Sequence, residues 1–235
     1  MAPITWLFDL DNTLHDASHA IFPAINANMN AFIARVLGGD GPPAGAEAVD
    51  AARIAYWKRY GATLLGMVRH HQVRQEDFLR EAHDFEDLAA MIRAERGLVR
   101  LLRRLPGRKI LLTNAPRNYS HAVLRHLGLH RHFAGHVPIE AMRVHGKLRP
   151  KPSRALLRKL VAREGLVPGQ CVLVEDTIAN LKSARAVGMG TAWVTGYLPG
   201  PARRKRPAYI DVKVKSFGQL ARCLPQLRQP RAPAP

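Results

Sequence analysis

The sequence contains few cysteines and no long hydrophobic run. Its 235 residues include two cysteines, Cys171 and Cys223, which are too few for a disulfide framework or a CxxC metal knuckle. No apolar run reaches the roughly 20 residues that cross a bilayer. The N-terminus has no basic segment and contains Asp9 and Asp11, so it does not have the pattern of a signal peptide. We therefore expect a cytoplasmic protein that makes no membrane contact.

Several catalytic signatures are also absent. The sequence contains no GxSxG, no Walker A motif, no HExxH and no GxGxxG after a predicted strand. These absences argue against the serine hydrolase, P-loop and dinucleotide-binding classes. The eleven histidines show no zinc-ligand spacing, which favours ordinary surface or core positions for them.

Acidic residues are scarce in the second part of the chain. The protein has 36 Lys+Arg and 18 Asp+Glu, for a formal net charge of +18. Residues 1–95 hold 8 basic and 13 acidic residues, whereas residues 96–235 hold 28 and 5. A basic surface attracts anions, and the run 203–206 would bind nucleic acid only weakly and without specificity. Because 27 of the bases are Arg, a GC-rich coding sequence explains the excess equally well. The charge therefore indicates no more than an anionic partner, and the oligomeric state stays open.

Short apolar runs alternate with helical patterns in the second part of the chain. The runs predict buried strands, and Gly residues end several of the helices. The predicted strands are 4–10, 109–112, 171–174, 191–194 and 210–214. Strands alternating with helices predict an α/β fold with a Rossmann-like parallel sheet.

The stretch between the first two strands is helical throughout and too long for a simple crossover. It predicts an inserted α-helical cap. The expected organisation is a catalytic core from 1–15 and 96–220, a helical cap from 16–95, and a flexible Arg/Pro-rich tail from 221–235.

Three of the predicted strands end in polar side chains. These are Asp9 and Asp11, then Thr113 and Asn114, then Glu175 and Asp176. Ligands of open α/β sheets bind at the carboxyl ends of the strands. Carboxylates can hold Mg²⁺ and can attack phosphorus, while a Lys, a hydroxyl and an amide stabilise phosphoryl oxygens. Together these groups predict phosphoryl transfer, with a small phosphorylated metabolite as the partner.

Four segments resemble the motifs of the haloacid dehalogenase superfamily, subfamily I. Residues 8–14 (FDLDNTL) resemble its DxDxT signature, and residues 111–115 (LLTNA) resemble its second motif. Lys151-Pro152 resembles the third motif, and residues 172–181 (VLVEDTIANL) resemble the fourth. Lys147 is an alternative third-motif lysine, but Pro152-Ser153 then begins a helix, which favours Lys151.

The resemblance implies a role for each motif residue. Asp9 would be the nucleophile, and Asp11 the general acid and then the base. Mg²⁺ would be held by the side chains of Asp9 and Asp176 and by the backbone carbonyl of Asp11. The other roles are phosphate binding by Thr113, Asn114 and Lys151, with Lys151 also catalytic, and support by Glu175 and Asn180. Taken singly, Thr113-Asn114 is also typical of a turn at a strand end, and Asp176 of a helix N-cap.

The helical stretch resembles the cap of yeast-type and bacterial pyrimidine 5′-nucleotidases. The resemblance rests on residues 56–61 (YWKRYG), 64–68 (LLGMV) and His71. It implies hydrolysis of a nucleoside 5′-monophosphate such as UMP or CMP, with substrate contacts from Tyr56, Tyr60, Leu65 and His71. Packing within the cap explains these four residues equally well. Two other functions stay open: a broad phosphatase of sugar or cofactor phosphates, and a basic nucleic-acid-binding protein on the same scaffold.

Overall fold

The chain forms two compact units. The computed structural model describes residues 4–198 and 205–227. Residues His19–Ala90 form one unit, and the described residues on either side of them form the other. We call these the helical unit and the sheet unit. Each is described separately below.

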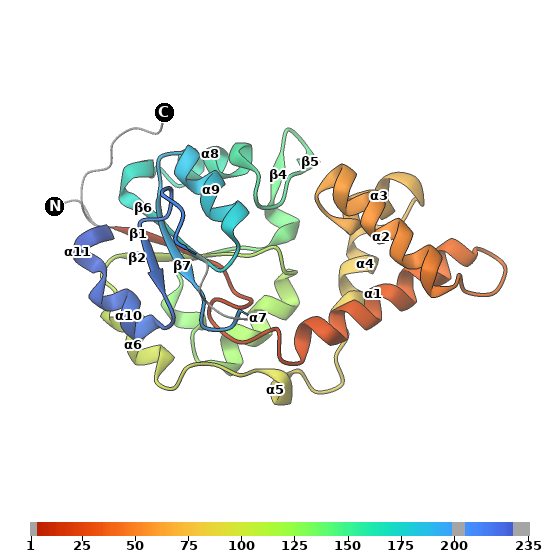
Figure 1. Cartoon of the computed structure of the whole chain (residues 1–235), viewed down its shortest axis with the longest axis horizontal. Coiled ribbons are helices and arrows are strands. Elements are labelled where there is room, and N and C mark those ends of the chain that lie inside the picture. The colour runs from red at the N-terminus through yellow and green to blue at the C-terminus, as the bar shows by residue number, and fades with distance from the viewer. Residues whose placement is uncertain (1–3, 199–204, 228–235) are drawn as a thin grey trace. The chain divides into compact units, whose positions relative to one another are not determined.

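Six parallel strands form the centre of the sheet unit (Figure 1). Their spatial order is β3-β2-β1-β6-β7-β8. The strands are β1 (Thr5–Phe8), β2 (Arg108–Leu112), β3 (Gly135–Val137), β6 (Cys171–Glu175), β7 (Gly190–Val194) and β8 (Val212–Val214). The predicted α/β fold with a parallel sheet is confirmed, and β3 is a strand that the sequence pattern misses because it is short and contains Gly135 and His136.

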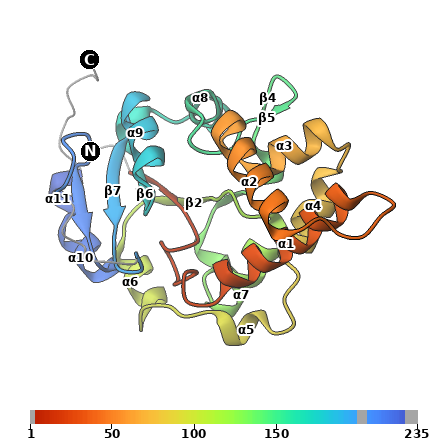
Figure 2. The same ribbon diagram turned by 45° about the vertical axis from the view of Figure 1, so that its right-hand side comes forward.

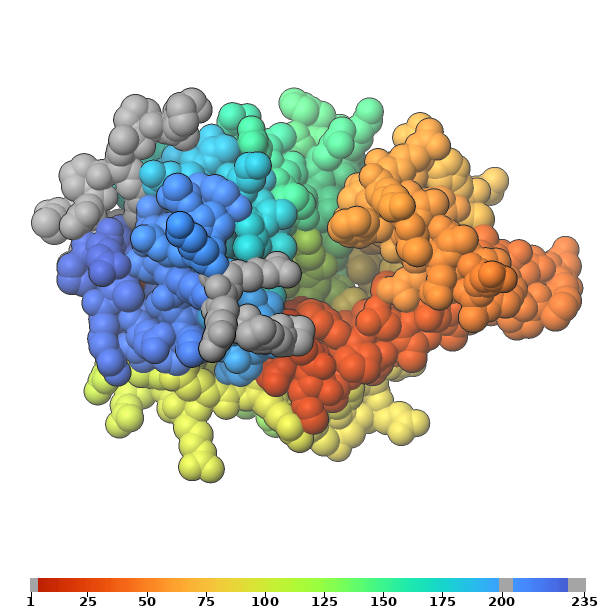
Figure 3. Space-filling model, in the orientation of Figure 1, coloured from red at the N-terminus to blue at the C-terminus, as the bar shows by residue number. Residues whose placement is uncertain are grey.

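Helices pack with the sheet of this unit, whose C-terminal part is drawn as blue spheres in the space-filling view (Figure 3). They are α6 (Leu98–Arg104), α7 (Arg117–His126), α8 (Arg154–Arg163), α9 (Ile178–Ala186), α10 (Phe217–Arg222) and α11 (Leu224–Leu227). Three short 3-10 turns (His130–His132, Ile139–Ala141 and Pro168–Gln170) and a two-stranded hairpin, β4 (Arg143–Val144) with β5 (Lys147–Leu148), complete the unit.

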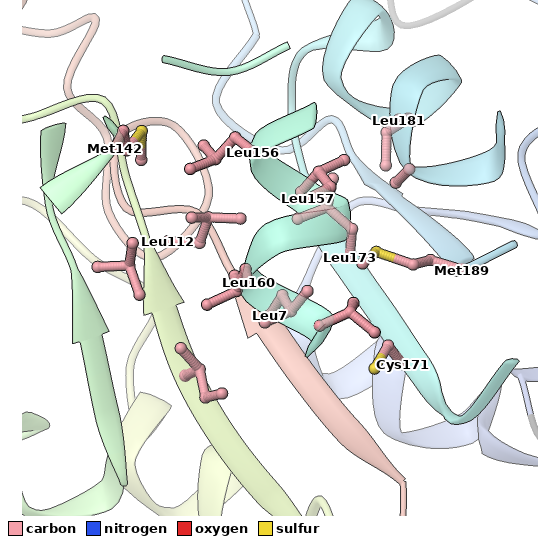
Figure 4. Packing of buried hydrophobic residues seen from close by; sticks show 14 of the residues in the cluster. Leu7, Leu112, Met142, Leu156, Leu157, Leu160, Cys171, Leu173, Leu181 and Met189 are labelled. Atoms are coloured by element: carbon pink, nitrogen blue, oxygen red, sulfur yellow. The ribbon is translucent and has the colours of Figure 1, made fainter. Parts of the chain in front are cut away.

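Alternate side chains of β1 enter different parts of the core. Leu7 packs in a buried cluster with Leu160 of α8 and Leu181 of α9, as Figure 4 shows. The neighbouring Phe8 stacks instead on Phe217 of α10, with ring centroids 5.7 Å apart. Because successive side chains of a strand leave it on opposite faces, helices must cover both faces of the sheet. Double coverage explains why every residue of β1 is buried.

The helical unit is built from four helices that pack together (Figures 1 and 2). They are α1 (Ile21–Gly38), α2 (Ala46–Tyr60), α3 (Thr63–His70) and α4 (Gln75–Ala82), and the short α5 (Leu88–Met91) follows. Phe32 of α1 meets Phe78 of α4 edge to face, with ring centroids 5.2 Å apart. Gly66 lets α3 approach α2, because a Cβ at this position would lie 2.1 Å from Cγ of Tyr56.

The C-terminal region differs from the sequence prediction of a flexible tail over 221–235. Residues 221–227 complete α10 and form α11, and Leu227 is 1% exposed. The break of one residue, Cys223, between two short helices, next to a Pro-rich end, hides this helical turn in the sequence. Residues 228–235 lie outside the described part of the chain, as do Arg203 and Arg204 of the basic run 203–206.

Arg206, which belongs to the same basic run, has an internal contact. Its Nη1 donates hydrogen bonds to the carbonyl of Ile210, at 2.5 Å, and to that of Asp211. Two carbonyl acceptors hold this guanidinium against the turn that precedes β8. Within the described residues, no helix has both the length and the apolar character that a membrane span requires.

Candidate active site

The carboxyl ends of three adjacent strands bring the predicted motif residues together. β1 lies between β2 and β6, so Asp9, Thr113 and Glu175 come from neighbouring strands. The backbone N–H of Asp9 donates to the carbonyl of Val174 at 3.0 Å, which continues the β1–β6 ladder to the end of the strand. The chain adds strands on one side of β1 and then on the other, and such a switch point is where α/β folds bind ligands.

Lys151 lies among the carboxylates of this site. Its Nζ is 2.6 Å from Oδ1 of Asp9 and 2.7 Å from Oε2 of Glu175, and the residue is 6% exposed. Ser153 follows it and caps α8 by accepting a hydrogen bond from the Leu156 N–H at 3.2 Å. The alternative lysine, Lys147, is exposed on β5. Of the two candidates, the structure therefore places Lys151 at the site.

Asn114 holds Lys151 in place through its backbone. The side-chain Oδ1 of Asn114 accepts from the Lys151 N–H at 2.9 Å, and its Nδ2 donates to the Lys151 carbonyl at 3.1 Å. The peptide bond between Lys151 and Pro152 is cis. Asn114 thus has a positioning role that the sequence does not predict, and its contact with phosphate stays a prediction.

Thr113 makes a local turn contact. Its Oγ1 accepts a hydrogen bond from the Ala115 N–H at 3.0 Å, and the residue is 1% exposed. This is the turn that the sequence also allows at this strand end. The hydroxyl hydrogen remains available for a phosphoryl oxygen in the same geometry, since the oxygen acts here as an acceptor.

Three carboxylates are close enough to hold a metal ion. One carboxylate oxygen from each of Asp9, Glu175 and Asp176 lies within 4.8 Å of the other two. The donors are all oxygens, which is the ligand chemistry of Mg²⁺, so the residues fit the predicted ion. Glu175, which the sequence assigns only to support, contributes its side chain directly to this group. Thr177 orients two of these carboxylates. Its N–H donates to Glu175 Oε1 at 3.2 Å, and its hydroxyl donates to Asp176 Oδ1 at 3.1 Å.

Burial is the main cause that raises the pKa of the three acids in this cluster. Burial, followed by the charge of Glu175, raises the pKa of Asp9 well above its ordinary value. Burial likewise raises the pKa of Glu175 and of Asp176. For Lys151, burial lowers the pKa, but the carboxylates of Asp9 and Glu175 more than offset this and raise it. One ammonium against three carboxylates leaves negative charge that a bound cation would neutralise.

The carboxylate of Asp11 lies in a different set of contacts. Its Oδ1 is 2.9 Å from Nε2 of His15 and accepts a hydrogen bond from the hydroxyl of Tyr119 at 2.5 Å. Neither partner is predicted by the sequence as a site residue. The spacing of four residues between Asp11 and His15 gives a weak signal, whereas nothing in the sequence places Tyr119 of α7 beside Asp11.

Asn12 organises the loop that carries Asp11. Its φ is 56°, in the left-handed region where Asn is one of the tolerated residues. Its Oδ1 accepts from the N–H groups of Ala17 and Ser18, each at 3.1 Å. These bonds fold residues 12–18 back on themselves and fix the loop after β1.

The remaining predicted residues are Asn180 in the sheet unit and four residues in the helical unit. Asn180 is buried in the first turn of α9, and its predicted supporting role stays a prediction. Tyr56, Tyr60, Leu65 and His71 belong to the helical unit. There, the Tyr56 hydroxyl lies 2.5 Å from Nε2 of His71, and Leu65 is half-buried on α3. These contacts support a packing role, and substrate contact by the four residues stays a prediction.

The chain belongs to the haloacid dehalogenase-like hydrolase family, whose sequence model matches residues 5–188. Among solved structures, it is similar to a HAD phosphatase from Thermococcus onnurineus, with a TM-score of 0.64 and 17% identity over 96% of this chain and 100% of that one. It is also similar to a 2-haloacid dehalogenase from Pseudomonas syringae, with a TM-score of 0.59 and 18% identity over 96% and 99% of the two chains. At these identities the structural likeness shows the fold alone.

Proposed function

We propose that this hydrolase is a Mg²⁺-dependent phosphomonoesterase that hydrolyses a nucleoside 5′-monophosphate, in particular a pyrimidine nucleotide, through an aspartyl-phosphate at Asp9. The contact between Lys151 Nζ and Asp9 Oδ1, inside a cluster of three carboxylates, carries this proposal. A dehalogenase needs no divalent cation to hold its carboxylate substrate, whereas a phosphoryl dianion beside three acids does.

Each residue of the site has a defined part in the proposed reaction. A carboxylate oxygen of Asp9 attacks phosphorus as the bond to the leaving oxygen breaks, and Asp11 gives that oxygen a proton. Water then attacks the phosphoryl group, Asp11 takes its proton, and the bond to Asp9 breaks to release phosphate. Lys151 and the Thr113 hydroxyl stabilise the phosphoryl oxygens.

Mg²⁺, held by Asp9, Asp176, Glu175 and the Asp11 carbonyl, would neutralise charge on the phosphoryl group. Burial and the charge of Glu175 raise the pKa of Asp9, and a cation bound beside the three acids would oppose this rise. The acid cluster is therefore suited to function with the cation present.

Nucleotide specificity rests on the resemblance of residues 56–71 to the caps of pyrimidine 5′-nucleotidases. A phosphatase with broad specificity for sugar or cofactor phosphates is the second candidate, favoured by the likeness to a HAD phosphatase from Thermococcus onnurineus. The high positive charge would speed the arrival of either anion.

A substrate panel tests the proposal. The kcat/KM values of UMP, CMP, AMP, several sugar phosphates and a 2-haloacid are compared at saturating Mg²⁺. Highest values for UMP and CMP support the nucleotidase, and uniformly low selectivity supports the broad phosphatase. Asp9→Asn should lose turnover of every phosphomonoester with the fold intact, while Asp40→Asn, in an exposed loop, should not. Full activity of Asp9→Asn would overturn the proposed chemistry.

A further inference from the structure

Two buried side chains contact the same oxygen of Asp11. Nε2 of His15 lies 2.9 Å from Asp11 Oδ1, and the hydroxyl of Tyr119 donates to this atom at 2.5 Å. His15 is 0% exposed and Tyr119 is 4% exposed. Neither residue belongs to the four sequence motifs, and neither has a role in the reaction proposed above.

The two contacts approach Asp11 from separate parts of the sheet unit. His15 comes from the loop that Asn12 folds after β1, where Thr13 and Leu14 donate backbone hydrogen bonds to the Leu10 carbonyl. Tyr119 comes from the first turn of α7, 108 residues further along the chain. A carboxylate that is held from two separate elements favours one orientation, since rotation about its χ2 would break both contacts.

The surroundings of His15 indicate which of its nitrogens is the donor. Its Nδ1 is buried, and it has no hydrogen-bond partner among the described residues. A buried N–H without a partner is rarer than a lone pair without one. We therefore place the proton on Nε2, which donates it to Asp11 Oδ1. Oδ1 then accepts two hydrogen bonds.

We propose that His15 and Tyr119 are positioning residues that hold Asp11 through Oδ1, so that Asp11 exchanges protons with the leaving group and with water through Oδ2. The proposal rests on the proposed role of Asp11 as general acid and base. In the first step the electron pair of the breaking P–O bond stays with the leaving oxygen, which takes the proton from Oδ2. In the second step, the proton of the attacking water goes to Oδ2.

This arrangement has an energetic reason. An oxygen that accepts two hydrogen bonds has little capacity left for a proton of its own, so the acidic proton of Asp11 is directed to the other oxygen. General acid catalysis is sensitive to the position of that proton, because a displacement of about 1 Å costs on the order of 100-fold in rate. Loss of either contact should therefore slow the step that needs the proton.

The test compares two substrates with different leaving groups. The ribose 5′-oxygen of UMP must be protonated as it leaves, whereas the nitrophenolate of p-nitrophenyl phosphate needs little protonation. We expect Tyr119→Phe to lower kcat for UMP at least about tenfold, to lower it much less for p-nitrophenyl phosphate, and to change KM little. Asp11→Asn removes the proton donor itself, so this variant should show the largest difference in kcat loss between the two substrates. Tyr197→Phe is the matched control, because it removes a hydroxyl that accepts from the Glu95 N–H and does not touch Asp11.

A pair of His15 variants tests the second contact. His15→Gln can place an amide N–H near the position of Nε2, whereas His15→Leu has no donor. In His15→Leu we expect kcat to fall much more for UMP than for p-nitrophenyl phosphate. In His15→Gln we expect a smaller difference between the two substrates. This pair carries the test alone if Tyr119→Phe does not fold, which thermal unfolding will show.

The outcomes separate this proposal from the proposed function. If Asp11→Asn shows the leaving-group difference and the Tyr119 and His15 variants lower both rates equally, or neither rate, the positioning proposal is overturned and the phosphatase chemistry stands. If the wild-type protein hydrolyses neither substrate, or Asp11→Asn keeps full activity on both, the proposed function itself fails.

Discussion

Asn114 and Lys151 form a reciprocal pair in which one side chain satisfies the backbone of the other. The amide of Asn114 accepts from the Lys151 N–H at 2.9 Å and donates to the Lys151 carbonyl at 3.1 Å. The Lys151 side chain then reaches Asp9 and Glu175. The loop after β2 thereby sets the position of the ammonium group next to the proposed nucleophile, although 37 residues separate the two partners.

Replacement of Asn114 should displace the ammonium group of Lys151 while the lysine itself remains. Asn114→Ala removes both backbone contacts, and we expect kcat/KM to fall at least about tenfold as the ammonium loses its position. The free energy of unfolding should fall by about 1–3 kcal/mol, the usual range for two hydrogen bonds. Steady-state kinetics and urea unfolding measure the two effects. Asn114→Asp keeps the acceptor and should lie between wild type and Asn114→Ala; an Asn114→Ala protein with wild-type kcat/KM would contradict the positioning role.

Removal of the Lys151 ammonium should cost both activity and stability. Lys151→Met leaves Asp9 and Glu175 without their ionic partner in a buried site, and breaking such a contact costs about 3–5 kcal/mol. We expect kcat to fall by on the order of 100-fold or more because the phosphoryl charge loses its cationic contact. Lys147→Met is the matched control, since Lys147 is exposed on β5. Equal effects of the two substitutions would show that Lys151 is not the lysine of the site.

Mg²⁺ should stabilise the protein through the acid cluster. Removal of divalent ions with EDTA should abolish turnover, and added Mg²⁺ should restore it. Binding at 100 times Kd adds about 2.7 kcal/mol to the free energy of unfolding, so Tm should rise with Mg²⁺ concentration. In Asp176→Asn this rise should shift to higher concentration, because one of the three carboxylates is lost. Asp40→Asn should respond as wild type does, and a Tm of Asp176→Asn with the wild-type Mg²⁺ dependence would argue against this site.

His136 should make stability depend on pH below neutrality. Burial, with the charges of Arg117 and His121, lowers the pKa of His136 to about 4, against a smaller opposing effect of Glu140. Its Nε2 lies 2.8 Å from the buried Ser120 hydroxyl. A lowered histidine pKa means that the unfolded chain binds the proton first as pH falls. Stability is therefore complete above the ordinary histidine pKa of about 6.5 and is lost as pH falls towards 4.

Replacement of His136 isolates this contribution from that of the carboxylates. His136→Gln can keep a contact with Ser120 but carries no proton that titrates. Because the group is partly exposed, we expect the wild type to lose about 1–2 kcal/mol more than the variant between pH 7 and pH 4. Urea unfolding at a series of pH values measures the difference. Parallel curves for the two proteins would contradict the lowered pKa.

Local patterns in the sequence are sufficient to predict most of the sheet and the places where polar groups collect. The strand that carries Asp9 and the strand that carries Glu175 are buried on both faces, so each is a short, continuous apolar run with a polar end. β3 and the β4–β5 hairpin lack such a pattern, because two or three residues are too few to show a period. The helical turn that ends at Leu227 is hidden for the same reason.

The directions of the side chains depend on contacts between distant segments. The approach of the Lys151 loop gives the amide of Asn114 two backbone partners that no local pattern in the sequence predicts. Lys147 lies on the β4–β5 hairpin and is exposed, whereas Lys151 lies just before α8 and is buried. Glu175 joins the acid group because it ends β6 beside Asp9.

The sequence by itself determined the α/β class, the parallel sheet of apolar strands and the polar residues that end several of them, because burial and period are local properties of a chain. The tertiary structure alone decided which oxygen of Asp11 meets His15 and Tyr119, and which carboxylate oxygens the Lys151 ammonium group contacts. Those contacts join residues up to 142 positions apart. Their geometry follows from the packing of whole helices and strands, which no local pattern records.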